Sequence, residues 1–102
     1  MDNRVIIYRD LFTSNNLDWC EKIVLTQIRY GCERFGNYSL NYKASAEFYD
    51  NLFTPEQIKF AAEKLMAVGI VDAEEVEVSL EGIPTFKALK VKVNEKKLKK
   101  IL

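Results

Sequence analysis

The sequence has no histidine and only two cysteines among its 102 residues. Histidine is the commonest general base in enzymes and a frequent zinc ligand, so its absence removes that base and argues against a zinc site. Cys20 and Cys32 lie in one expected helix, roughly 18 Å apart at 1.5 Å of rise per residue. This separation excludes a disulfide between them, and the sequence contains no CxxC pair. We therefore expect no metal site.

The recognisable catalytic and nucleotide-binding motifs are also missing. The sequence contains no P-loop and no GxSxG, HExxH or GxGxxG pattern. Acidic residues are plentiful, but no two of them stand as a pair in an apolar stretch, as glycosidase or protease chemistry requires. We expect a protein that is not an enzyme, that uses no cofactor and that has no small-molecule substrate.

Long apolar runs are absent as well. No stretch approaches the roughly 18 apolar residues of a membrane-spanning helix. The first ten residues, MDNRVIIYRD, have neither the apolar core nor the small-residue cleavage site of a signal peptide. We expect a cytoplasmic protein without membrane partners. Hydrophobic residues make up 48% and charged residues 29% of the chain, which is typical of a single globular domain with one core.

Net charge is also absent, because 15 basic residues balance 15 acidic ones, but the distribution along the chain is uneven. Residues 69–83 contain five acidic residues and no basic one. Residues 84–102 contain seven lysines and one glutamate. A nonspecific nucleic-acid binder usually has an excess of basic residues. Here that excess is confined to the C-terminal segment.

The clearest structural signals that are present lie in residues 54–71. Thr54 suits a helix N-cap, Pro55 suits the first helical position, and Gln57 stands where a capping box needs Glu or Gln. Gly69 follows the last turn, where a positive φ ends a helix at little cost. Apolar residues recur at helical spacing and form one stripe: Ile58, Ala61, Ala62 and Leu65. This pattern predicts a helix of about four turns that runs into a strand.

A second helix is predicted from Leu17 to about Arg34, with Asn16 as its cap and Gly36 after its end. Its expected core face is Leu17, Cys20, Val24, Ile28 and Phe35, with Leu25 and Cys32 at the flank. Three further apolar residues share a different face: Trp19, Ile23 and Tyr30. Either the helix is central and buried on two sides, or this second face binds a partner or another copy of the chain.

Shorter elements are expected around these two helices. Val5 to Tyr8 is an edge strand or an extended arm, and Tyr38 to Leu40 is a short strand. Asn41 or Ser45 caps a third helix, and Asn51 forms the turn after it. Residues 94–102 carry four lysines and are interpreted as a solvated terminus, a phosphate-contacting tail or a small dimer element.

Two runs of alternating apolar and charged residues, 75–80 and 86–93, predict a hairpin with its connection across Glu81 to Phe86. The expected register places Val76 opposite Val91, and Val78 opposite Leu89. Acidic residues of the first strand then face lysines of the second, and each such pair stabilises the sheet by a few tenths of a kcal/mol. The expected charge pairs are Glu77 with Lys90 and Glu75 with Lys92.

The order helix, strand, helix, turn, helix, hairpin resembles that of winged helix-turn-helix domains in phage and plasmid replication proteins and related regulators. The segment LDWCEKIVLTQIRY is similar to their first helix, and TPEQIKFAAEKLMAVGIV resembles their recognition helix. The resemblance implies an α+β winged helix, with a three-helix core, a C-terminal β-hairpin wing and a short basic tail. The expected single domain, 1–102, comprises an N-terminal arm (1–16), the core and wing (17–93) and the basic tail (94–102).

The resemblance implies that this chain binds double-stranded DNA. It also implies a role in replication or transcription control, of phage, plasmid or mobile-element type. Gln57 and Lys59 are expected to approach the major groove, where Gln pairs with adenine and Lys with guanine or phosphate. The lysines expected to contact the phosphate backbone are Lys43, Lys64 and Lys87.

Three residues on the same helix depart from the family pattern. Glu56, Phe60 and Glu63 stand where family members often have Arg or Lys. Carboxylates are repelled by phosphates. An exposed aromatic side chain surrounded by charged residues is suited to anchor a protein partner. The alternative is therefore a winged-helix module for partner recognition or homodimerisation, with little or no DNA binding. Its expected contact residues are Trp19, Ile23, Tyr30 and Phe60.

Overall fold

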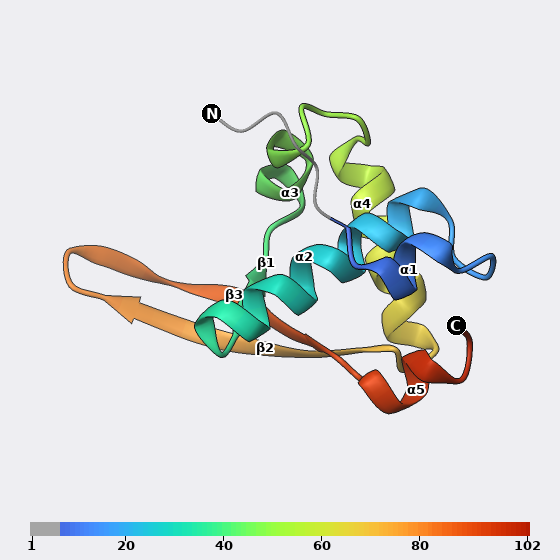
Figure 1. The fold of residues 1–102 in the computed structure, drawn as a ribbon. Helices are drawn as coiled ribbons and strands as arrows, with labels where there is room; N and C mark the ends of the chain where they lie inside the picture. Colours follow the sequence, from blue (N-terminus) through green and yellow to red (C-terminus); the bar gives the residue numbers. More distant parts are fainter. Residues whose placement is uncertain (1–6) are drawn as a thin grey trace.

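The computed structural model describes residues 7–102, and within them it confirms the α+β class (Figure 1). The elements in chain order are α1 (Arg9–Thr13), α2 (Trp19–Phe35), β1 (Tyr38–Leu40), α3 (Tyr42–Phe48), α4 (Pro55–Ala67), β2 (Val71–Leu80), β3 (Ile83–Val93) and α5 (Glu95–Lys99). The three strands form one antiparallel sheet in the order β1-β3-β2. The expected N-terminal strand begins outside the described residues, and Tyr8 belongs to no strand.

The predicted signals of α4 are confirmed. The Thr54 hydroxyl oxygen accepts from the Gln57 amide at 3.2 Å, and the Gln57 side-chain oxygen accepts from the Thr54 amide at 2.8 Å. Gly69 has a φ of +81°, which ends the helical run before β2. All four residues of the apolar stripe are buried, and α4 packs against α2 and α3. Local sequence chemistry therefore defines both ends of this helix, and its buried stripe packs it on α2 and α3.

Helix α2 begins two residues later than predicted, at Trp19 instead of Leu17. Asp18 is the N-cap, and it forms a capping box with Glu21 through bonds of 2.8 and 2.9 Å. Asn16 does not cap the helix because its side chain donates to the carbonyl of Ile101. At the other end Gly36, with a φ of +79°, closes the helix as expected.

The predicted core face of α2 is correct except at its last residue. Leu17, Val24, Leu25 and Ile28 are buried, and Cys32 packs against the core from the side. Phe35, however, is 70% exposed. It is the final residue of the helix and lies nearly one turn beyond Cys32, where α2 last meets the core cluster.

The connection from α2 to α4 follows the prediction closely. Strand β1 has the expected bounds, and the Asn41 side chain accepts from the Ala44 amide at 2.9 Å as the cap of α3. The helix ends at Phe48, and two residues with positive φ then turn the chain. These are Asp50, with a φ of +54°, and Asn51, with a φ of +58°.

The predicted hairpin exists, but its predicted register is wrong by three residues. Val76 lies opposite Ala88, and Val78 lies opposite Phe86. The reason is a tight turn at Gly82, whose φ of +78° takes the place of the expected longer connection. Consequently the expected pairs Glu77 with Lys90 and Glu75 with Lys92 do not form.

Other acid–lysine pairs replace them in the observed register. Asp72 lies opposite Lys92, and Glu74 lies opposite Lys90. A diagonal ion pair also joins the Lys87 ammonium to the Glu75 carboxylate at 3.4 Å. The lysines of β3 therefore still lie next to acidic residues of β2.

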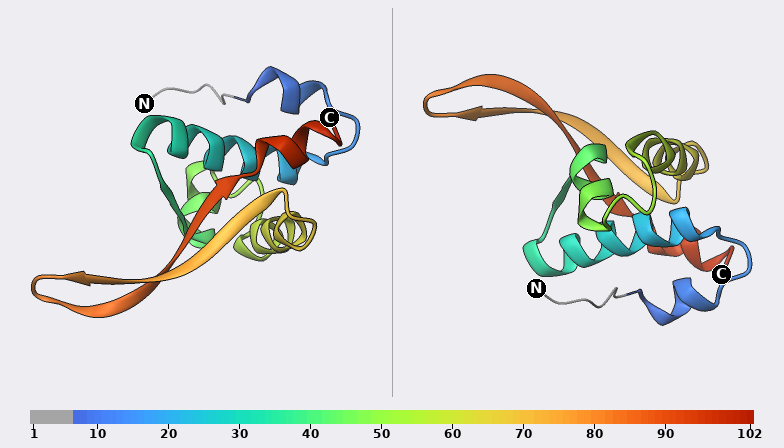
Figure 2. Two further views of the ribbon diagram at one scale, coloured as in Figure 1. Left: turned by 90° about the horizontal axis from the view of Figure 1, so that it is seen from below. Right: turned by 90° about the horizontal axis from the view of Figure 1, so that it is seen from above.

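Both ends of the described chain pack onto the helical body (Figure 2). Leu11 of α1 and Leu98 of α5 are each 0% exposed and belong to the core cluster. The Arg29 guanidinium joins the two segments, at 2.9 Å from Asp10 and 2.7 Å from Glu95. The interpretation of residues 94–102 as a solvated terminus is therefore wrong.

Candidate functional site

Trp19 and Phe60, predicted as contact residues on separate helices, line one groove. It has a volume of about 550 Å³ and lies between the beginnings of α2 and α4. Trp19 is 51% exposed and Phe60 is 73% exposed. We call this hollow the aromatic groove; its lining residues are Asp18, Trp19, Cys20, Phe53, Glu56, Gln57, Phe60 and Ala61.

A helix cap and two neighbouring side chains hold the Trp19 ring in place, whereas Phe60 is exposed. Trp19 directly follows the Asp18 cap, and the Phe12 ring meets it edge-on at 5.5 Å between centroids. The Lys22 ammonium lies 4.6 Å from the centre of the Trp19 ring, which adds a cation–π contact. Phe60 projects from the outer side of α4, and no described segment covers it.

The rim of the aromatic groove is acidic, and the Cys20 thiol that lines the groove is unreactive. Asp18 and Glu56 supply carboxylates on two sides. The Cys20 sulfur lies 3.5 Å from the Gln57 carbonyl oxygen, to which it donates. Burial, followed by the charges of Asp18 and Glu21, raises the pKa of Cys20 to about 11. The thiol therefore stays protonated at neutral pH, and the groove offers apolar contact and negative charge rather than a nucleophile.

The predicted DNA-contacting lysines are exposed, but three of them have an acidic neighbour. The Lys59 ammonium lies 3.8 Å from Glu63, and the Lys64 ammonium lies 3.7 Å from Glu21. Lys87 has its pair with Glu75 on the hairpin. Among residues 7–102, only Lys43 of the predicted set has no carboxylate within 4 Å.

The remaining predicted DNA contact, Gln57, is partly committed to the fold. Its side-chain oxygen accepts the Thr54 amide within the capping box. The amide NH₂ and the second lone pair of the oxygen remain available, but the bond to Thr54 restricts the orientation of the group. A bidentate contact to adenine uses both the oxygen and the NH₂, so the cap limits the geometries in which Gln57 can make it.

The predicted face of Trp19, Ile23 and Tyr30 is not one surface. Ile23 is 3% exposed, which supports the interpretation of α2 as buried on two sides at this point. Tyr30 lies instead at a second hollow of about 310 Å³. That hollow is lined by Thr26, Gln27, Tyr30, Gly31, Phe35, Tyr38, Phe48 and Tyr49.

Sequence reasoning did not find the aromatic residues that complete these hollows. Phe48 and Phe53 lie at either end of the α3–α4 connection, and only the fold shows which helix each one faces. The available signal was the density of aromatic residues between Tyr30 and Phe53. Burial raises the pKa of Tyr49, in the second hollow, to about 12, so this phenol stays protonated at neutral pH.

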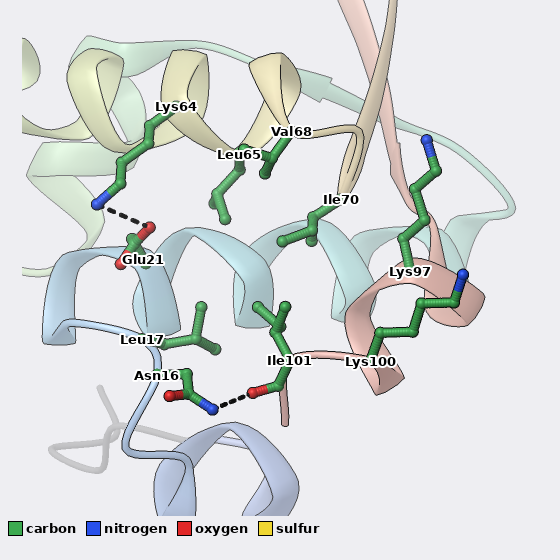
Figure 3. A pocket seen from close by; sticks show the side chains of 10 residues that line it. All are labelled: Asn16, Leu17, Glu21, Lys64, Leu65, Val68, Ile70, Lys97, Lys100 and Ile101. Atoms are coloured by element: carbon green, nitrogen blue, oxygen red, sulfur yellow. Dashed lines mark hydrogen bonds and ion pairs between the residues drawn. The ribbon is translucent and has the colours of Figure 1, made fainter.

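A third hollow of about 440 Å³ lies where α5 meets α2 and α4 (Figure 3). Leu17, Leu65 and Ile101 lie inside it, with the Lys64–Glu21 pair at one side. Lys97 and Lys100 extend from α5 at the other side. The lysines of the tail therefore flank the end of α4, whereas the predicted DNA contacts Gln57 and Lys59 lie at its beginning.

Between residues 7 and 102, none of the helices has the length and apolar character needed to cross a membrane. The same part of the chain contains no group of three or more Cys, Asp or Glu side chains placed to hold a metal ion. When the chain is compared with models of known protein families, with curated proteins and with solved structures, no match is found.

Proposed function

We propose that the chain is a winged-helix domain in which α4 occupies the position of the recognition helix. The order α2, β1, α3, α4, β2, β3 supports this proposal, as does the pairing of β1 with β3 on the side away from β2. The hairpin then corresponds to the wing. The capping box and Gly69, which carry the sequence resemblance, define α4 in the structure as well.

We propose further that the main function of this domain is to bind a protein partner through the aromatic groove. The observation that carries the proposal is the convergence of exposed Trp19 and Phe60 on one hollow. Large aromatic side chains dominate the binding energy of protein interfaces when a partner buries them. The acidic rim favours a partner segment in which an apolar anchor is flanked by Lys or Arg.

Binding to double-stranded DNA, in replication or transcription control, is the second candidate function. The observation that favours it is the exposure of Lys43, Gln57 and Lys59, of which Lys43 has no acidic neighbour among the described residues. DNA contact by Lys59 requires it to leave Glu63. Breaking the Lys59–Glu63 pair costs free energy, and the Gln57 oxygen already accepts a hydrogen bond from the Thr54 amide in the cap. We therefore rank DNA second to a protein partner.

Truncation of the groove aromatics is expected to abolish partner binding. Trp19→Ala and Phe60→Ala should each lower the amount of co-purified partner at least about tenfold, which corresponds to a loss of roughly 1.4 kcal/mol or more. The measurement is quantitative mass spectrometry of material captured by the tagged chain. Phe48→Ala is the matched control, because Phe48 is 74% exposed but lies outside the groove. Equal recovery with all three variants would contradict the proposal.

The DNA candidate makes a different prediction for α4. If α4 binds duplex DNA, Lys59→Ala should weaken a mobility shift, and Glu63→Lys should strengthen it by removing the acidic neighbour of Lys59. The affinity should also fall steeply as salt rises, because bound counterions are released. The measurement uses genomic fragments at low and moderate salt. If no shift occurs at low salt, DNA binding is rejected.

A further inference from the structure

The hairpin of β2 and β3 reaches far beyond the helical body (Figures 1 and 2). Its outer part carries three apolar cross-strand pairs on one face, which we call the apolar ladder: Val76 with Ala88, Val78 with Phe86, and Leu80 with Ile83. Leu80, Ile83 and Phe86 are between 44% and 53% exposed. The opposite face of the same segment is polar, with Ser79 bonded to Thr85 at 3.1 Å.

The apolar ladder does not continue the protein's own core. Near the body, Val71 and Val91 are buried on the other face of the strands, toward the helices. From Val76 outward the apolar residues change to the face that carries exposed Asp72 and Lys92 near the body. Folding of this chain does not need that change, because a two-stranded ribbon gains little stability from one uncovered apolar face. Contiguous exposed apolar residues of this kind mark an interaction surface.

The charges on the same face indicate what covers it. Acidic residues lie on β2 and lysines lie on β3, so Asp72 is opposite Lys92 and Glu74 is opposite Lys90. A two-fold axis parallel to the strands, between two such faces, places β2 of each copy over β3 of the other. Every acidic residue then meets a lysine of the second copy, and the apolar ladders meet each other. We propose that the apolar ladder is a homodimer interface in which two hairpins pack face to face.

The alternative of edge-to-edge pairing between copies is disfavoured by charge. Strand β2 is a free edge of the sheet, and it contains Asp72, Glu74, Glu75 and Glu77. Pairing β2 with β2 of a second copy would bring these acidic side chains side by side, which destabilises a sheet. In the face-to-face arrangement the helices, which pack on the face of Val71 and Val91, lie on the outer side of each copy. The charge pattern therefore disfavours pairing through β2 and is compatible with face-to-face packing.

The face that two copies would share is small. Nine residues of β2, from Asp72 to Leu80, span roughly 30 Å at 3.3 Å per residue, and two strands are roughly 10 Å wide. This footprint is smaller than the roughly 800 Å² that each partner contributes to a standard stable interface. We therefore expect a weak dimer that forms only at high protein concentration.

Sedimentation equilibrium across a concentration series tests the interface. The mass of the unmodified chain should rise from 11.8 kDa toward twice that value as concentration increases. Val78→Lys should remain monomeric, with its dissociation constant raised at least about thirtyfold by a charge in the apolar ladder. Ser79→Lys is the matched control, since it adds the same charge one residue away on the polar face. It should dimerise as the unmodified chain does, and so should the groove variant Phe60→Ala.

A charge exchange tests the proposed two-fold arrangement. Glu74→Lys and Lys90→Glu should each weaken self-association, because like charges then meet across the interface. An equimolar mixture of the two variants should associate more strongly than either variant alone. The proposal is overturned if the unmodified chain stays at 11.8 kDa throughout. It is also overturned if Ser79→Lys is as damaging as Val78→Lys, or if the mixture gains nothing.

Discussion

Replacing Leu98 with alanine is expected to lower the free energy of unfolding by about 3 kcal/mol, within the range for a buried leucine. Leu98 is 0% exposed and belongs to the core cluster, although it lies only four residues before Leu102. Helix α5 has only five residues, so it cannot stay folded without tertiary contacts. The loss of this anchor should therefore also release the segment that carries it.

The backbone around α5 explains why the effect extends beyond one side chain. The Asn94 amide donates to the Ile70 carbonyl at 2.7 Å, and the Asn94 side chain caps α5 through the Lys97 amide at 3.1 Å. Glu95 on the same helix binds Arg29 of α2. Detachment of α5 therefore removes hydrogen bonds and an ion pair together with the apolar contact.

Chemical denaturation with urea measures this effect. Leu102→Ala is the control, because Leu102 is 40% exposed and its truncation should change the free energy of unfolding by less than about 0.5 kcal/mol. Equal stability of Leu98→Ala and Leu102→Ala would mean that the tail contributes nothing to the folded state. If the unfolding free energy of Leu98→Ala falls less steeply with urea concentration, the segment has already detached in the native state.

The elements that the sequence predicts well are those defined by local chemistry. The capping box at Thr54, the Asn41 cap and the glycine at position 69 each act within one helical turn. Helix α1 is different, because it has no side-chain cap and depends on buried Leu11 in the core cluster. Residues 9–13 therefore give no local signal for a helix. Helix α5 has the local Asn94 cap but also depends on buried Leu98.

The register of the hairpin shows why a correct pattern is not sufficient. A shift of three residues changes which residues of β3 face Val76 and Val78. Ala88 and Phe86 take the expected places of Val91 and Leu89, and Leu89 lies opposite Glu75. The positive φ of Gly82 selects the tight turn and hence the observed register. This register creates the apolar ladder, because it places Phe86 opposite Val78.

The sequence predicts single contact residues of the candidate site, but it does not predict that they lie together. Helical spacing places Trp19 and Phe60 on the outer sides of their helices, but it does not say that those sides share a groove. The packing of α2 on α4 brings them together. The same packing covers Ile23, which helical spacing alone had grouped with Trp19.

Arg29 makes the second large contribution to stability, and its replacement by methionine is expected to lower the free energy of unfolding by about 2 kcal/mol. Its side chain is 10% exposed, and it binds Asp10 of α1 and Glu95 of α5. Its guanidinium also lies 4.7 Å from the centre of the Tyr8 ring. Methionine keeps much of the apolar volume but none of the charged hydrogen bonds. The loss stays moderate because both carboxylates are about half exposed and become hydrated.

The pH dependence distinguishes the ion pair from simple packing. The hydrogen bond from Arg29 is the main cause that lowers the pKa of Asp10 below its usual value of 3.8. A carboxyl whose pKa is lower in the folded state stabilises the fold above its unfolded pKa, and this stabilisation is lost as pH falls through the folded pKa. The stability difference between the unmodified protein and Arg29→Met should therefore be largest near neutral pH and shrink below about pH 4.

Urea unfolding at about pH 7, 4 and 3 provides the measurement. Asp10→Asn should remove part of the pH dependence while leaving Arg29 paired with Glu95. Arg34→Met is the matched control, because Arg34 is an exposed arginine of the same helix that makes no ion pair with the described residues. If Arg29→Met lost the same free energy at every pH, its role would be apolar packing. If instead the stability difference between the two proteins is present at neutral pH and disappears at low pH, the guanidinium holds α1 and α5 on α2 by charge.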